Sequence, residues 1–277
     1  MKIKLVAYDS FSTRAMATLI ETDHKIFIDP SISIAPFRYG LPPSHVEMEE
    51  LEKRYNEIIE LGKKADIIII THYHWDHCPH PENDEHLEIL KNKIILAKDF
   101  RNTNKSQYFR GNFLYNKIKN LEFCDKKKYE FENTYIEFSS GVFHGEKNSK
   151  LGKVVMAYIE YLGNNILFGS DIQGILTEEV LKFIVNKNPK ILILSGPPIY
   201  HPKWKKELEE KFIENLVIIK EKTKIEKIIL DHHSARSKNY LEYLKYLNEK
   251  VKIKILSGAD FMNIRNRLLE ANRDKFY

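Results

Sequence analysis

A run of four isoleucines, Ile67 to Ile70, leads directly into a segment rich in metal-binding side chains. A β-branched apolar run of this length predicts a buried β-strand. The segment 71–77 reads Thr-His-Tyr-His-Trp-Asp-His, so three imidazoles and a carboxylate stand at the end of that strand. Imidazole nitrogen and carboxylate oxygen are ligands for zinc, iron and manganese. Because four such groups cannot all reach one ion without strain, the pattern predicts a site for two ions.

Further candidates each stand just after another predicted strand: Asp29, His144, Asp171 and His232. The pattern His-x-His-x-Asp-His, with these residues before and after it in order, resembles the metallo-β-lactamase superfamily of metallohydrolases. The resemblance spans residues 29 to 232. Within the superfamily the chain is most similar to a subgroup of predicted hydrolases, with some likeness to the tRNA 3′-processing endonuclease branch.

The resemblance implies an α/β fold of the αβ/βα four-layer sandwich type, with two packed mixed β-sheets flanked by helices. The residues alone predict only the α/β class, because strand-like and helix-like segments alternate in the second half. We expect a single metallo-β-lactamase-like domain over residues 1–277. Its two pseudo-equivalent halves are expected at about 1–150 and 151–277.

Several element boundaries can be predicted from local signals. Ser44-x-x-Glu47 has the spacing of a capping box and predicts a helix that ends near Gly62. A β-hairpin is expected across Gly163-Asn164, and a helix is expected over residues 260–273. Segment 103–120 is rich in basic and aromatic residues and is compatible with more than one structure.

The resemblance also implies a role for each candidate ligand. One ion is expected on His72, His74 and His144, a second on Asp76, His77 and His232, and Asp171 is expected to bridge the two. The catalytic roles go to Asp171 and to Asp76, which can also orient the attacking water. Zinc is the first expectation for both ions, with iron or manganese as alternatives. Asp29 is expected to fix the tautomer of a ligand imidazole by accepting its hydrogen bond. Asp9 and Ser10, at the end of the first strand, receive no role.

Candidates for substrate contact are Ser234, Arg236, Tyr200, His201 and His233. The run Leu-Asp-His-His-Ser-Ala-Arg over 230–236 resembles a His-x-Ser-x-Arg motif of the tRNA 3′-processing branch, which selects His232 as the ligand. Neighbouring strand residues point to opposite faces, so only one of His232 and His233 is expected to ligate. A guanidinium can bind phosphate or carboxylate through two hydrogen bonds, although Arg236 also fits a structural salt bridge. Tyr200 and His201 equally fit a proline-fixed turn before a helix.

The implied function is a metallohydrolase in which a hydroxide activated by two metal ions attacks a small ester, thioester, lactone or phosphoester. One alternative is an RNA or DNA phosphodiesterase of the tRNA 3′-processing type. Basic and aromatic side chains interleave over residues 102–119, as suits phosphate contacts and base stacking, although an amphipathic element with a solvated face has the same composition. The other alternative is a non-catalytic binding protein with this fold.

Composition limits the partners and the location. The formal net charge of +5 permits an anionic substrate and does not require nucleic acid. Two cysteines, Cys78 and Cys124, argue against a disulfide framework and for a reducing, cytoplasmic location. No apolar stretch approaches the ~20 residues of a membrane span. A composition rich in Lys and Glu and poor in Gln is typical of thermophilic proteins, although genomic base composition explains it as easily.

Overall fold

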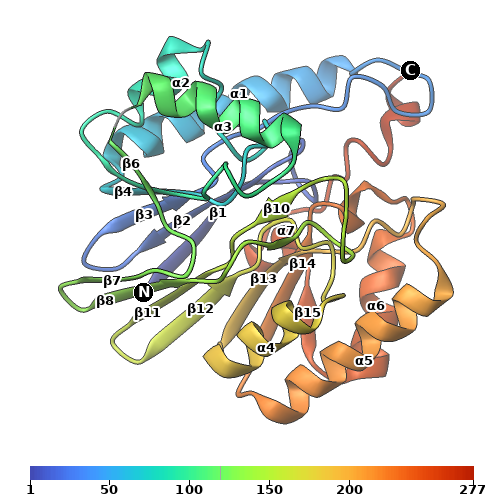
Figure 1. Cartoon of the computed structure of the whole chain (residues 1–277). Helices are drawn as coiled ribbons and strands as arrows, with labels where there is room; N and C mark the ends of the chain where they lie inside the picture. Colours follow the sequence, from blue (N-terminus) through green and yellow to red (C-terminus); the bar gives the residue numbers. More distant parts are fainter. Residues whose placement is uncertain (119) are drawn as a thin grey trace.

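Two β-sheets pack face to face, and helices cover both outer faces, so that the molecule has four layers (Figure 1). The structure is a computed structural model that describes residues 1–118 and 120–277. Its layers confirm the predicted fold class. Among the described residues, no helix combines the length and the hydropathy needed to cross a membrane.

The first sheet has the strand order β1-β2-β3-β4-β5-β6. Its strands are β1 (Lys2–Tyr8), β2 (Met16–Glu21), β3 (Lys25–Ile28), β4 (Ile67–Ile70), β5 (Ile94–Ala97) and β6 (Leu121–Phe123). The pairs β1/β2 and β2/β3 are antiparallel, whereas β3 to β6 run parallel. The outer face is covered by α1 (His45–Lys64), α2 (Asp84–Glu88) and α3 (Lys105–Lys117) (Figure 1).

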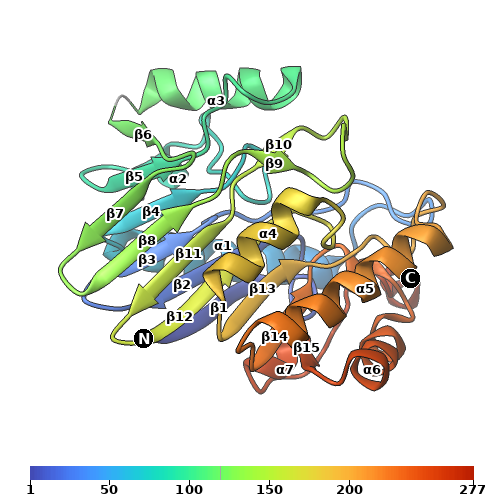
Figure 2. The same ribbon diagram turned by 60° about the horizontal axis from the view of Figure 1, so that its bottom comes forward.

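The second sheet has the order β15-β14-β13-β12-β11-β8-β7. Its strands are β7 (Lys128–Phe131), β8 (Thr134–Phe138), β11 (Ala157–Tyr161), β12 (Asn164–Phe168), β13 (Ile191–Ser195), β14 (Lys227–Asp231) and β15 (Lys254–Leu256). Strands β12 to β15 run parallel, and the rest are antiparallel. The outer face is covered by α4 (Glu178–Lys187), α5 (Lys206–Lys222) and α6 (Tyr240–Val251) (Figures 1 and 2).

Short elements lie around the two sheets. The strands β9 (Val142–Phe143) and β10 (Lys153–Val154) pair with each other, and α7 (Gly258–Phe261), η1 (Ser234–Arg236) and η2 (Arg273–Phe276) are single turns. The chain passes from the first sheet to the second between β6 and β7. The division into two halves near residue 150 stays a prediction.

Strand β4 shows how the sequence fills two cores at once. Ile67 and Ile69 lie in the core between the two sheets, whereas Ile68 and Ile70 lie in the core beneath the helices of the first layer. All four side chains are fully buried. Alternate residues of a strand point to opposite faces, so an unbroken apolar run is what a strand buried on both faces requires. Each buried side chain contributes about 1.5–3 kcal/mol. The polar residues 71–77 can therefore begin only where the strand leaves the core.

The predicted local signals are mostly confirmed. Ser44 and Glu47 form the capping box of α1, which continues two residues beyond Gly62. The hairpin forms between β11 and β12, with Tyr161 opposite Asn164. Segment 103–120 contains α3, and Lys119 lies outside the described residues.

The helix predicted over residues 260–273 is wrong. Helix α7 ends at Phe261, and the backbone of Asn263 and of Leu268 is left-handed, with φ of 54° and 49°. The amides of Arg267 and Leu268 donate to the carbonyl oxygen of Ser10 instead of to a helix. Leu268, Leu269 and Ala271 are buried against the body of the protein, whereas Ile264 is exposed. Tertiary contacts therefore override the local pattern.

Candidate metal centre

The candidate site lies where several strands of both sheets end. Each of these strands contributes the first polar residues after its C-terminal end: Asp9 after β1, Asp29 after β3, His72 after β4, Asp171 after β12 and His232 after β14. His144 follows β9. Loops at the C-terminal ends of parallel strands are the usual place for functional residues in α/β folds.

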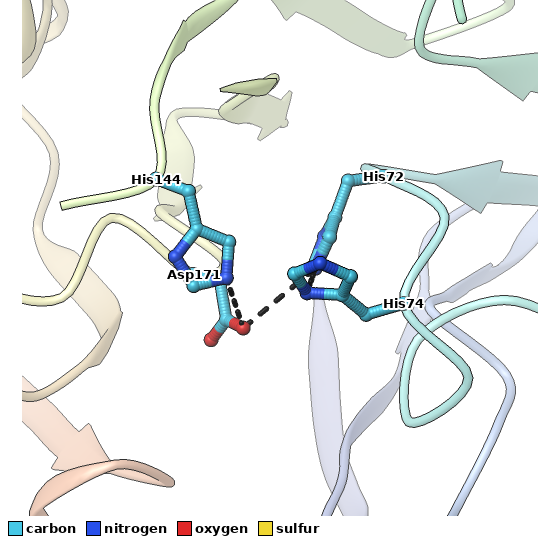
Figure 3. Close-up of side chains that lie close together, drawn as sticks. All are labelled: His72, His74, His144 and Asp171. Carbon is cyan, nitrogen blue, oxygen red and sulfur yellow. Dashed lines mark hydrogen bonds and ion pairs between the residues drawn. The ribbon is translucent and has the colours of Figure 1, made fainter. Parts of the chain in front are cut away.

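A first group of possible ligands comprises His72, His74, His144 and Asp171, with one ligand atom of each within 4.8 Å of the others. Figure 3 shows these side chains pointing toward one another, His72 and His74 from one loop and His144 and Asp171 from two other segments. His72 Nε2 lies 3.1 Å from His74 Nδ1, and Asp171 Oδ2 lies 2.9 Å from His144 Nε2. Two ligands on a tetrahedral zinc ion are about 3.3 Å apart, given zinc–ligand bonds of about 2.0 Å. The observed spacing fits such an ion.

Several polar atoms in this group lack the partners that burial normally demands. Three buried atoms have no hydrogen-bond partner among the described residues: the two ring nitrogens of His144 and Oδ1 of Asp171. The 2.9 Å contact between His144 and Asp171 is short but lacks hydrogen-bond geometry. Buried polar atoms are almost always paired. A cation between His144 Nε2 and Asp171 would satisfy one of the two ring nitrogens and the carboxylate, so the residues fit a metal ion.

A second group comprises Asp76, His77 and His232. The Nε2 atoms of His77 and His232 are 3.4 Å apart, and His232 Nε2 is 3.6 Å from Asp76 Oδ2. Asp171 lies between the groups, with Oδ2 3.4 Å from His77 Nε2 and Oδ1 3.3 Å from His232 Nε2. The structure thus brings all predicted ligands together, and their assignment to two ions stays a prediction.

Two buried carboxylates orient the imidazoles of the second group. Asp29 lies 2.8 Å from His77 Nδ1 and also accepts hydrogen bonds from the amide and the hydroxyl of Thr71. Asp9 lies 2.7 Å from His232 Nδ1. An ionised carboxylate can only accept, so each ring nitrogen Nδ1 carries a proton and each Nε2 faces the centre. Against the effect of burial, Asp171 raises the pKa of His77 and Asp9 raises the pKa of His232 to about 9, so an ion bound at these Nε2 atoms would replace a proton. Asp29 therefore lies where a tautomer-fixing residue is expected.

Asp9 is the functional candidate that sequence reasoning missed. Strand β2 is antiparallel to both β1 and β3, so β1 and β3 run in the same direction and end at the same edge. A carboxylate directly after β1 must therefore reach the same edge as Asp29. The antiparallel pairing of β2 with both β1 and β3 was the signal that would have identified Asp9.

Arg236 lies inside the centre rather than in an open cleft. Its side chain is buried, and its Nε donates to Asp9 Oδ1 at 2.8 Å. Its Nη2 lies 2.9 Å from His232 Nε2 and 3.5 Å from Asp76 Oδ2. The contact with Asp9 is the salt bridge that the sequence left open as an alternative. A positive charge therefore stands beside the second ligand group and not beside the first.

The charge states of the site favour a cation. Burial and the neighbouring imidazoles lower the pKa of His72, and they lower the pKa of His74 to about 3, so both rings keep a free lone pair. Burial alone would raise the pKa of Asp171, but the nearby His232 and His77 outweigh it and lower that pKa. In the same way His232 and Arg236 outweigh burial and lower the pKa of Asp9 to about 2. The carboxylates of the centre are therefore ionised.

The backbone is strained at three of the strand ends that build the site. Asp29, Ser170 and His232 have φ of 48°, 49° and 55°, in the left-handed region. Such residues cost roughly 1–3 kcal/mol each and cluster at functional sites. Because His232 is not extended, the alternation of strand side chains does not hold there. His233 Nε2 also reaches Asp171, at 3.4 Å, so both rings face the centre, and the choice of His232 as the ligand stays a prediction.

Curated relatives share the full length of the chain. A UPF0282 protein of Saccharolobus solfataricus is 35% identical over 290 residues, which cover 100% of this chain and 93% of that protein. A UPF0282 protein of Korarchaeum cryptofilum is 36% identical over 287 residues, which cover 100% of this chain and 94% of that protein. The chain belongs to the UPF0282 family. No protein-family model matches it. The UPF0282 relatives come from thermophilic archaea, in agreement with the composition.

Solved structures identify the fold of this UPF0282 chain. A possible metal-dependent hydrolase from Veillonella parvula has a TM-score of 0.55 at 13% identity, over 92% of this chain and 94% of that chain. A metallo-β-lactamase fold protein from Bacillus subtilis has a TM-score of 0.53 at 12% identity, over 91% and 94%. A diiron β-hydroxylase from Streptomyces venezuelae has a TM-score of 0.51 at 10% identity, over 92% of this chain and 52% of that chain. The chain has the metallo-β-lactamase fold, as the motifs implied.

The remaining candidates for substrate contact lie on one side of the centre. Tyr200, His201 and His233 line a cavity of about 580 Å³ next to the metal centre. Ser234 does not face it: the side chain is buried, and its hydroxyl donates to the carbonyl oxygen of Pro197 at 2.8 Å. A Cβ on Gly196 would lie 2.0 Å from that hydroxyl, so the turn needs glycine there. Ser234 thus holds the turn that shapes the cavity, which does not support its direct contact with substrate.

Proposed function

We propose that this protein is a metal-dependent hydrolase with a dinuclear centre that acts on a small ester, thioester, lactone or phosphoester. The observation that carries the proposal is the position of Asp171 between two groups of buried ligands, with buried polar atoms that lack partners. The fold neighbours named as metal-dependent hydrolases support the reaction class. The β-hydroxylase among them is a reason to argue the reaction from the site and not from the fold.

Divalent ions at such a centre polarise a carbonyl or phosphoryl oxygen and lower the pKa of water toward about 7. The residues of the chain do the rest. Asp29 and Asp9 hold two rings in the tautomer whose lone pair faces the centre. Asp76 is the most exposed of the ligand carboxylates, with 15% of its side chain accessible, and can accept a hydrogen bond from the attacking water.

His233 differs from His232 in the proton it carries. Arg236 Nη1 lies 3.2 Å from His233 Nδ1, and a guanidinium can only donate, so that nitrogen accepts. Nε2 then carries the hydrogen, and the amide of Gln173, whose nitrogen lies 3.1 Å away, must turn its oxygen toward it. An Nε2–H group cannot ligate an ion, but it can donate a hydrogen bond to the oxygen of a leaving group. His233 lines the cavity, with 12% of its side chain accessible. In this proposal His232 binds the metal ion and His233 donates the hydrogen bond.

A nuclease is the second candidate, and helix α3 is the observation that favours it. Phe109 on this helix is 57% exposed, and Lys105 lies over its ring at 5.9 Å. Gln107 of the same helix donates to the carbonyl oxygen of Leu151 at 2.7 Å, so a basic and aromatic surface borders the wall of the cavity. A purely binding role is disfavoured, because a buried set of unpaired ligands is costly to keep without an ion.

Metal dependence gives the first test. We expect the zinc-loaded protein to hydrolyse at least one of bis-p-nitrophenyl phosphate, an acyl thioester and a lactone. Removal of the metal with a chelator should lower the rate at least about 100-fold, and added zinc should restore it, because metal ions supply several kcal/mol of transition-state stabilisation. Activity that persists in demonstrably metal-free protein would rule out the proposal. Preference for the phosphodiester would favour the nuclease, and structured RNA would be tried next.

A further inference from the structure

Two segments of the chain line the cavity next to the metal centre. One side is the loop between β9 and β10, residues 144–152, and the other is the turn and helix start that follow β13. Figure 2 shows the β9–β10 hairpin between α3 and α4. Two side chains of the α3 end fix the loop: Asn104 donates to the carbonyl oxygen of Lys150 at 2.8 Å, and Gln107 donates to that of Leu151. His144 and His233 place the metal centre at the inner end of the cavity.

The outer part of the cavity wall is positively charged. Lys147 and Lys150 come from the loop and Lys203 comes from the turn opposite, with Glu146 as the acidic lining residue. Across residues 1–118 and 120–277, no carboxylate lies within ion-pair distance of these three ammonium groups, although many other lysines of the chain are paired. Unpaired ammonium groups on facing walls attract an anion into the space between them.

The remaining wall is apolar. Leu176, Trp204 and Leu208 line it, and the indole N–H of Trp204 is held by the carboxylate of Glu209 at 2.8 Å. The ring of Trp204 also packs edge to face against Phe212, with centroids 6.5 Å apart. A fixed aromatic face of this kind suits an apolar group of a ligand.

This inference rests on the proposed function. We propose that the substrate is an organic anion with an apolar body, and that its carboxylate or phosphate group is separate from the bond that is hydrolysed. The anionic group lies among Lys147, Lys150 and Lys203, and the apolar body lies against Trp204. The scissile bond then falls at His144 and His233. Water adds to the carbonyl carbon or phosphorus, the bond to the leaving oxygen or sulfur breaks, and the leaving group takes up the proton. A cavity of about 580 Å³ is of the size that binds such small molecules.

Binding of an inert probe tests this inference without any hydrolysis. We expect 1-naphthalenesulfonate to bind the zinc-loaded protein, measured by titration calorimetry at low salt. Neutral 1-naphthalenemethanol and inorganic sulfate should each bind at least about tenfold more weakly. The triple variant Lys147→Gln/Lys150→Gln/Lys203→Gln should lower the affinity for the sulfonate on the order of tenfold, since exposed ion pairs contribute little each but add up.

Lys206→Gln is the matched control, because Lys206 is an exposed lysine near Lys203 that does not line the cavity. It should leave the affinity unchanged. Equal binding of the charged and neutral naphthalenes, or an unchanged affinity in the triple variant, would overturn the inference. Either result would leave the hydrolase proposal standing, because that proposal depends on the chelation test and not on the probe.

Discussion

Replacing Asp171 by alanine is expected to lower the hydrolytic rate by a factor on the order of 10³ or more and to reduce the bound metal, while the chain stays folded. Asp171 is the predicted ligand whose carboxylate reaches both ligand groups, at 2.9 Å from His144 Nε2 and 3.3 Å from His232 Nε2. In the proposed dinuclear centre its loss would remove a ligand from each ion, and several kcal/mol of transition-state stabilisation correspond to about three powers of ten in rate. Rate, metal per chain and circular dichroism are measured together.

The fold should survive this change because the one hydrogen bond of this carboxylate among the described residues is the long contact of Oδ2 with His233 Nε2, at 3.4 Å. Its Oδ1 has no partner among the described residues, and Asp76 and Asp9 add further negative charge nearby. The neighbouring imidazoles lower the pKa of Asp171, so its charge contributes to the stability of the metal-free fold at neutral pH, and the thermal midpoint of the metal-free variant should fall modestly without loss of the fold. Asp274→Ala, which changes an exposed carboxylate paired with Lys238, is the control that should keep full activity. Wild-type activity and metal content in Asp171→Ala would contradict the dinuclear model.

Replacing Asp9 by alanine should lower the free energy of unfolding by about 3–5 kcal/mol, because the buried guanidinium of Arg236 then loses its carboxylate. Metal affinity should fall about 10–100-fold, since nothing then fixes the ring of His232. Urea unfolding of metal-free protein measures the first effect, and zinc titration measures the second.

The variant Arg236→Met and the double variant Asp9→Ala/Arg236→Met separate these two roles. Removal of both charges together should recover much of the lost stability, because no unpaired charge then stays buried. The weakened metal affinity should persist in the double variant, since His232 still lacks its partner. If the double variant regained the metal affinity as well, Asp9 would act only through Arg236 and not on the ring.

The metal centre could be predicted because its ligands follow short apolar strands in order along the chain. Asp171, for example, comes three residues after the end of β12. Asp9 could not be assigned in the same way, because its partner His232 lies far away in sequence and only the pairing of β1 with β2 brings it to the right edge. Asp29 could be predicted as the partner of a ligand imidazole from the order of the motifs, whereas Asp9 depends on strand pairing that the motifs do not contain.

Two errors have a common cause. The rule that neighbouring side chains alternate failed at His232 because its backbone is left-handed, and the helix over residues 260–273 failed because amides there bond to Ser10. In both places long-range contacts set the backbone, and local patterns carry no information about them. By contrast, Ser44 and Glu47 form their capping box from neighbours alone, which is why that prediction was confirmed.

The most direct test of the account is the number of zinc ions per chain, measured by elemental mass spectrometry on protein titrated with zinc and then freed of unbound metal. We predict two ions per wild-type chain, and we predict that the second binds more weakly because Arg236 Nη2 stands 2.9 Å from His232 Nε2. A single ion at saturation would contradict the dinuclear centre, and no bound ion would show that the cluster from His72 to His232 is not a metal site.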